Sequence, residues 1–130
     1  MVVIMTPLIV AGTAFAASST LTVKGPHKMV ASGAKYEVTI SGTAAEGAST
    51  MEELEGGYAN GTAIKCDTTY RAEVTKYGSQ EFVAYSVTGR FVKHVILFAN
   101  SSGDKALCAY LTNAAGTATY AHASAHWRNG

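Results

Sequence analysis

The sequence predicts an all-β protein: an antiparallel β-sandwich of about seven strands with one or two short helical turns and one disulfide. Short segments alternate polar with apolar residues, which is typical of strands that bury one face. Turn signals built from Gly, Asn, Asp and Pro recur about every 8–12 residues, as in antiparallel sandwiches. Strands and helices do not alternate along the chain, so the sequence does not predict a parallel α/β sheet. Together these observations favour two antiparallel sheets packed face to face.

Seven segments have this strand character. In chain order they are 19–24, 35–41, 58–66, 81–87, 91–98, 105–112 and 117–125. Residues 35–41 show it most clearly, because Tyr36, Val38 and Ile40 fall on one face and polar residues on the other. We expect Gly42 to end this strand. Residues 88–90 predict a tight hairpin connection between 81–87 and 91–98.

Two further segments predict helical or irregular structure. In residues 42–57, Thr50 and Glu53 match a capping box, and two glycines close the segment. A single helical turn or a loop is expected there. In residues 67–77, two tyrosines and a valine recur at helical spacing, whereas the threonines favour a strand. We expect a short helix in this segment.

The N-terminal stretch predicts a signal peptide over residues 1–16 and a single domain over residues 17–130. Residues 1–17 carry no ionisable side chain, and residues 14–16 (Ala-Phe-Ala) form the small-x-small pattern that signal peptidase accepts. The apolar stretch, about 16 residues long, is shorter than the roughly 20 needed to span a bilayer. It lacks a preceding Lys or Arg, which a start inside a longer signal would explain. A buried strand or a membrane anchor is the alternative.

Charge composition bounds the possible partners. Ten Lys and Arg residues stand against nine Asp and Glu, a formal net charge of +1. Such a chain cannot supply the basic stripe that neutralises nucleic-acid phosphates, so no nucleic-acid partner is expected. No membrane span is predicted in the mature chain, which we expect to be secreted or held at the cell surface. No segment forms a cofactor motif, and no cofactor is expected.

The two cysteines, Cys66 and Cys108, predict a disulfide. An even count in an exported chain favours pairing, because the compartment beyond the membrane is oxidising. The chain-entropy model gives a loop of this length roughly 4 kcal/mol of stabilisation. Two unpaired buried thiols are the alternative. A structural zinc site is disfavoured because the paired Cys-x-x-Cys spacing is missing.

Residues 103–111, Gly-Asp-Lys-Ala-Leu-Cys-Ala-Tyr-Leu, resemble the penultimate strand of small secreted bacterial immunoglobulin-like domains. Cys66 before a short irregular segment and the Val-Thr-Ile-Ser-Gly string at 38–42 fit the same family. The resemblance covers residues 19–125 and implies an immunoglobulin-like β-sandwich. The second strand has no Cys, however, and the only Trp is Trp127 near the C-terminus. The likeness therefore implies the sandwich architecture and not an antibody-type core.

The histidines and carboxylates predict neither a metal site nor a catalytic site. His122 and His126 would lie roughly 13 Å apart in a strand, too far to hold one ion. The acidic residues of segment 42–57 occur without the ordered Asp and Asn ligands of a calcium loop, so they are interpreted as a solvated face. No serine sits in a nucleophile elbow. We expect no enzymatic activity.

Seven tyrosines against one Trp suggest a binding surface. Tyr58, Tyr70 and Tyr77 lie in the least regular part of the chain, where exposed rings suit protein or carbohydrate contacts. The alternative is that these rings pack over a sheet with their hydroxyls at the rim.

The predicted function is a non-catalytic extracellular binding or structural module that makes protein–protein contacts at the cell surface or in a secreted assembly. A carbohydrate-binding module that uses exposed tyrosines is the alternative, and a small secreted inhibitor or enzyme ranks third.

Overall fold

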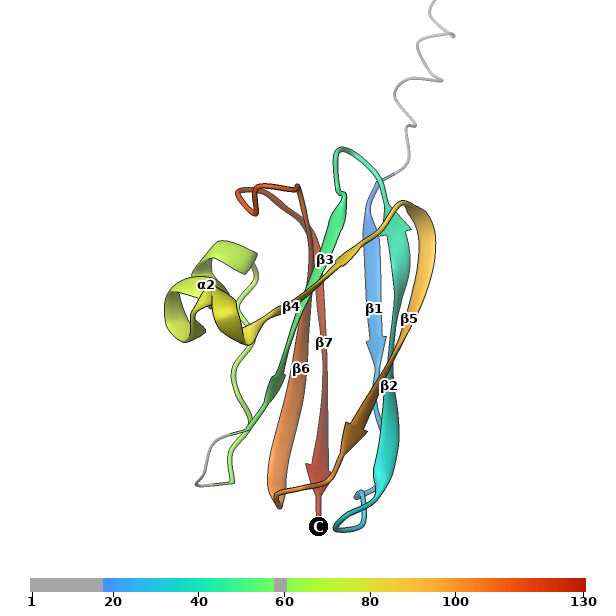
Figure 1. The fold of residues 1–130 in the computed structure, drawn as a ribbon, viewed down its shortest axis with the longest axis vertical. Coiled ribbons are helices and arrows are strands. Elements are labelled where there is room, and N and C mark those ends of the chain that lie inside the picture. Colours follow the sequence, from blue (N-terminus) through green and yellow to red (C-terminus); the bar gives the residue numbers. More distant parts are fainter. Residues whose placement is uncertain (1–17, 58–60) are drawn as a thin grey trace, which may run out of the picture.

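The computed structural model describes residues 18–57 and 61–130, so the predicted signal peptide at 1–16 and Tyr58 lie outside the described residues. The described chain forms seven strands, one α-helix and one 3₁₀ turn (Figure 1). The strands are β1 Thr20–Lys24, β2 Lys35–Ala44, β3 Thr50–Gly56, β4 Val83–Ser86, β5 Gly89–Phe98, β6 Gly103–Thr112 and β7 Thr119–Asn129. The helix α2 spans Tyr70–Tyr77, and the turn η1 spans Ser79–Glu81. No described helix is long and apolar enough to cross a membrane.

The strands form two antiparallel sheets, ordered β1-β2-β5 and β4-β3-β6-β7. In immunoglobulin nomenclature these orders correspond to A-B-E and C′-C-F-G. The predicted immunoglobulin-like β-sandwich is therefore confirmed by the order of its strands. Figure 1 shows the two sheets facing each other, with α2 on the outer side of the four-stranded sheet.

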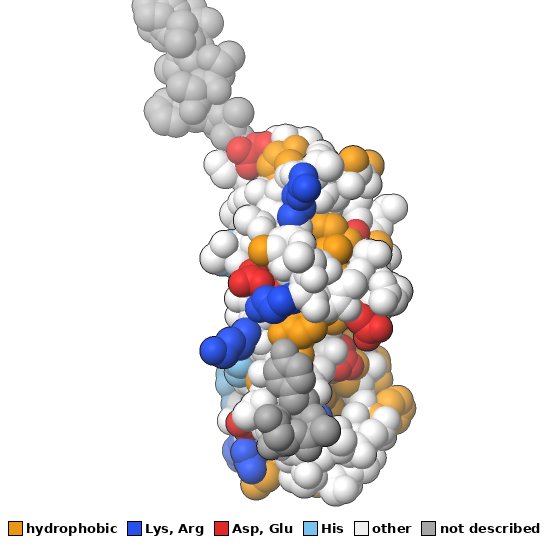
Figure 2. Space-filling view, turned by 90° about the vertical axis from the view of Figure 1, so that its left-hand side faces the viewer, with side chains coloured by type: hydrophobic (Ala, Val, Ile, Leu, Met, Phe, Trp, Pro, Cys, Tyr) orange, Lys and Arg blue, Asp and Glu red, His pale blue; other side chains and the backbone are white. Residues whose placement is uncertain are grey.

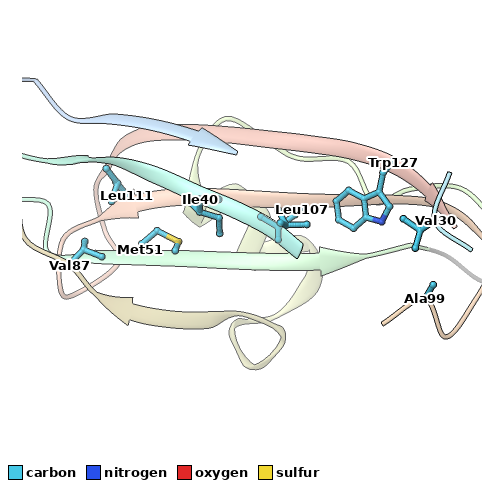
Figure 3. Packing of buried hydrophobic residues seen from close by; sticks show 10 residues of the cluster. Val30, Ile40, Met51, Val87, Ala99, Leu107, Leu111 and Trp127 are labelled. Carbon is cyan, nitrogen blue, oxygen red and sulfur yellow. The ribbon is translucent and has the colours of Figure 1, made fainter. Parts of the chain in front are cut away.

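The main core lies between the two sheets and is built by the alternation that the sequence predicts. Its buried members are Val30, Val38, Ile40, Met51, Val87, Ala99, Leu107, Ala109, Leu111 and Trp127 (Figure 3). The indole of Trp127 packs edge-on against Tyr36, with ring centroids 5.7 Å apart, and its Nε1 donates to Tyr36 Oη at 2.9 Å. The single tryptophan thus reaches the core from the last strand, and its one polar atom is satisfied across the two sheets.

A second apolar cluster covers the outer face of β6. Ala106, Cys108 and Tyr110 point away from the main core and pack with Leu54 and Ile64. The chain between β3 and β4 supplies much of the remaining cover. Strand β6 is consequently buried on both faces. The unbroken apolar run at 106–111 is typical of a strand in that position.

The predicted helix at 67–77 is confirmed as α2. Thr69 caps it, because the Thr69 side-chain oxygen accepts a hydrogen bond from the Ala72 amide at 3.2 Å. Glu73 lies on the buried face of the helix and is fully buried, and its Oε1 accepts a hydrogen bond from the Asp67 amide at 2.8 Å. Burial raises the pKa of Glu73, while the Asp67 backbone bond opposes that shift.

The disulfide between Cys66 and Cys108 is present, with Cα atoms 5.5 Å apart. It does not join the two sheets, as the antibody-type bridge does. It fastens the chain that leads into α2 to the outer face of β6. The covering layer is thus held by a covalent bond as well as by packing.

Two sequence predictions about strands are wrong. The segment containing Thr50 and Glu53 is strand β3 and neither a helical turn nor a loop, because it pairs with both β4 and β6 and this pairing overrides the local capping motif. The strand predicted at 58–66 is not formed over 61–66, where only an isolated bridge joins Gly57 to Ala63. The number of strands was predicted correctly although one member was misplaced.

Two predicted connections also differ from the structure. Gly42 does not end β2, which continues to Ala44. A Cβ at Gly42 would collide with the Thr20 carbonyl of β1, so the glycine permits close strand pairing there. Residues 88–90 do not close a hairpin, because β4 and β5 belong to different sheets. The chain crosses between the sheets at this point, and Val87 is buried at the crossing.

Replacing both cysteines by alanine is expected to lower the free energy of unfolding by about 4 kcal/mol. The unfolded variant has no crosslink, so it regains the conformational entropy that closure of a long loop removes. Urea denaturation of the wild type and the double variant measures the difference. Unchanged stability would mean that packing alone holds the outer layer on β6.

Candidate functional site

One side of the sandwich is open. On the opposite side β1 and β7 lie against each other and close the gap between the sheets. On the open side β4 and β5 are the edge strands, and β5 pairs only with β2 among the described strands. An unpaired strand edge presents backbone donors and acceptors that another extended chain can pair with.

The outward face of β5 is unusually apolar for an edge strand. Val92 is 54% exposed, Ile96 49% and Phe98 56%. His94 interrupts this row, and its Nδ1 lies 2.8 Å from Glu37 Oε2 on β2. That hydrogen bond lowers the pKa of Glu37. The row therefore consists of three exposed apolar side chains around a histidine that already has a partner.

Polar side chains lie between the sheets behind the same edge. Glu53 of β3 is 3% exposed, and its Oε2 accepts a hydrogen bond from Tyr85 Oη of β4 at 3.3 Å. Lys93 of β5 places its Nζ 5.3 Å from the Tyr85 ring centroid. Burial raises the pKa of Glu53 to about 7, the charge of Glu55 adds to this shift, and the Tyr85 hydrogen bond opposes it.

The two edge strands themselves carry basic residues and no acidic ones. Strand β5 carries Arg90, Lys93 and His94 and no acidic residue, and β4 carries no charged residue. Of the acidic residues on the neighbouring strands, Glu37 of β2 is hydrogen-bonded to His94, and Glu53 of β3 accepts a hydrogen bond from Tyr85.

The tyrosines predicted to bind a partner lie elsewhere. Tyr70 packs in the outer cluster, with ring centroids 5.1 Å from Phe82 and 6.2 Å from Tyr110. Tyr77 belongs to the same cluster, and its Oη accepts a hydrogen bond from the Lys65 amide at 3.4 Å. Both are half-buried on the α2 face, where charges of both signs are interspersed (Figure 2). A binding role for them stays a prediction.

The histidines and cysteines do not add a metal site to this edge. His122 and His126 lie on the exposed face of β7. Ligand atoms of Cys66, Glu73 and Cys108 lie within 4.8 Å of one another, but both sulfurs belong to the disulfide and offer no thiolate.

Sequence reasoning missed the edge row, although a signal for it exists. In residues 91–98 apolar side chains occupy both alternating positions, with Phe91, Val95 and Leu97 on the inner face. A strand that is apolar on both faces is either covered on both or available to a partner. Only the strand order shows that β5 is an edge.

No family model matches this chain, and no curated protein sequence matches it. Two solved structures resemble it: the solution NMR structure and a crystal structure of the CARDB domain of PF1109 from Pyrococcus furiosus. The NMR structure is 12% identical with a TM-score of 0.49, covering 86% of this chain and 94% of that domain. The crystal structure, described as a complex with di-metal ions, is 13% identical with a TM-score of 0.46, covering 88% and 94%. Likeness at this level carries no argument about function.

Replacing Glu53 by Gln is expected to flatten the dependence of stability on pH. The pKa of this carboxyl is about 7 in the folded chain and 4.5 in the unfolded chain, so its contribution to the stability of the fold is fully present below pH 4.5. That contribution is lost as pH rises through the folded pKa and amounts to about 3 kcal/mol at most. Glu53→Gln should therefore exceed the wild type in stability at about pH 8 and not at about pH 4.

Urea denaturation at both pH values measures this effect, with Glu81→Gln on the exposed η1 turn as the control. The control should change stability little, because its side chain is exposed. An equal difference between Glu53→Gln and the wild type at both pH values would show that Glu53 does not titrate in this window.

Proposed function

We propose that this chain is a non-catalytic extracellular module that binds a protein partner through the free edge of β5. The observation that carries the proposal is the row of exposed apolar side chains on an unpaired strand edge. Natural edge strands are usually protected by charges, proline or a covering segment. An edge that instead exposes Val92, Ile96 and Phe98 is suited to pairing with another chain.

The partner that fits is an extended segment that adds to β5 as a further strand. Backbone hydrogen bonds would supply affinity, and alternate apolar side chains would pack on Val92 and Ile96. Acidic residues at the alternate positions of the segment would lie on the side of Lys93, because Lys93 is on the inner face of β5 and Val92 and Ile96 are on its outer face. The proposed partner segment is thus acidic and apolar in alternation.

Two further observations support this proposal. The disulfide fits an oxidising compartment outside the cytoplasm, which accords with cleavage of residues 1–16 and a single domain over 17–130. In addition, a pocket of about 410 Å³ that brings His27 and His126 to Asp104 contains no serine among its lining residues. Its Asp104 is already paired with Arg128 at 2.8 Å, which argues against a catalytic triad there.

A short peptide alternating Val and Glu tests the proposal, with a Val–Lys peptide as the reversed-charge control. Hydrogen exchange followed by NMR on the full chain measures protection of the β5 amides that do not bond to β2. We expect the acidic peptide to slow exchange at those amides and the basic peptide to leave them unchanged.

Ile96→Asp is expected to weaken binding of the acidic peptide by about tenfold or more, because it removes apolar contact and adds a repelling charge. Thr22→Asp on the outer face of β1 is the matched control and should bind normally. Equal binding of both peptides would overturn the proposal. Protection of β5 that appears without peptide and grows with protein concentration would also overturn it, because a second copy of the chain would then occupy the edge.

A further inference from the structure

A small polar pocket lies between the two sheets at the end of the sandwich where β7 finishes. Its volume is about 250 Å³, and five different strands contribute to its lining. The residues that matter for its chemistry are Tyr36 of β2, Glu55 of β3, Phe98 of β5, Lys105 of β6, Asn129 of β7 and Ser101 of the β5–β6 turn. The acidic peptide proposed for the β5 edge does not require this pocket.

Lys105 is a buried cation that forms no ion pair with a described carboxylate, although its charge acts on Glu55 across the pocket. Its side chain points into the sandwich, the residue is 9% exposed, and Nζ donates to Ser101 Oγ at 2.7 Å. No carboxylate of the described residues lies within ion-pair distance of Nζ, and residues 1–17 and 58–60 contain no Asp or Glu. A buried charge is costly unless it is paired or well hydrogen-bonded. The ammonium is therefore suited to donate to an oxygen that a ligand supplies.

Asn129 adds a second incompletely satisfied group beside Lys105. The residue is 3% exposed, and its Nδ2 donates to the Ser101 carbonyl at 3.3 Å. Its Oδ1 has no donor among the described residues. Buried acceptors in native proteins are normally satisfied by protein, water or ligand. The back of the pocket therefore lacks a hydrogen-bond donor.

The other walls supply hydroxyl, carboxylate and aromatic groups. Tyr36 Oη accepts from Trp127 Nε1 and also interacts with the Asn129 side chain, and its own proton remains to donate. Glu55 stands at the exposed rim, where partial burial raises its pKa and the charge of Lys105 opposes that shift. Phe98 lines the pocket from the end of the exposed outer row of β5, so it borders the mouth of the pocket and not its interior. One positive and one negative group leave the pocket with no net charge.

We propose that this pocket binds a neutral sugar ring. Sugar hydroxyls both donate and accept, so one ring can accept from Lys105 and Tyr36 and donate to Glu55 and Asn129. The apolar face of the ring would pack against Phe98. The pocket is smaller than the roughly 300–1,000 Å³ of sites for drug-sized ligands, which fits a single ring at the end of a glycan.

Trp127 is the only tryptophan in the chain and reports on the pocket, because its Nε1 bonds to the Tyr36 hydroxyl in the wall. The test titrates the full chain with the methyl glycosides of glucose, galactose, mannose and N-acetylglucosamine and follows Trp127 fluorescence. Glucuronate and glycine are the charged comparison probes. We expect a saturable change with at least one neutral glycoside and weaker responses to both charged probes.

Phe98→Ser and Lys105→Met are each expected to weaken glycoside binding by about tenfold or more. Val92→Ser is the matched control, since Val92 is similarly exposed on the same strand but does not line the pocket. Phe98 lies at the surface, so its replacement should leave the thermal unfolding midpoint nearly unchanged. If Lys105→Met fails to fold, the comparison of Phe98→Ser with Val92→Ser still tests glycoside binding.

No response to any neutral glycoside would overturn the proposal. Tighter binding of glucuronate would indicate an anion site instead, and tighter binding of glycine would indicate an amino-acid site. A response that persists in Phe98→Ser would place the sugar elsewhere. Because Lys105→Met leaves the β5 edge intact, binding of the acidic peptide by this variant separates the two proposals.

Discussion

The rest of the structure depends on the burial of β6 on both faces. Its inner side chains, among them Leu107 and Leu111, fill the space between the sheets, and its outer side chains Cys108 and Tyr110 would be exposed in a bare sandwich. The chain between β3 and β4 covers them, and the disulfide attaches that cover to the strand it protects. A strand with no solvent-facing side needs neighbours in every direction, and the third layer follows from that requirement.

The two long sides of the sandwich differ in how their edge strands are protected. Where β1 and β7 meet, the chain closes on itself. Where β4 and β5 lie, the inner face carries Glu53, Tyr85 and Lys93, and the outer face of β5 carries apolar groups. Polar groups thus lie among the apolar ones inside, and apolar groups lie outside, on a side that no segment of the described residues covers. Both candidate sites adjoin β5, which contributes the edge to one and Phe98 to the other.

The sequence predicted the elements whose pattern is local. Strand β2 alternates cleanly, and α2 has helical spacing with a capping Thr69. Strand β3 was missed because Thr50 and Glu53 imitate a helix start, and only pairing with β4 and β6 decides otherwise. The polar pocket could not be predicted, since its walls come from five strands far apart in the chain. Periodicity reports which face a residue occupies, but it does not report which edges and ends come together.

The disulfide lies outside the main core, so it crosslinks the covering layer to β6 and does not crosslink the two sheets. The sandwich interior contains no sulfur crosslink, so its packing does not depend on the redox state of the surroundings. The α2 layer does depend on it, because Cys66 is its covalent attachment. In a reducing environment the covering segment would be held by packing alone, so it would open more readily than the two sheets separate. For this chain, loss of the crosslink and loss of the fold are distinct events.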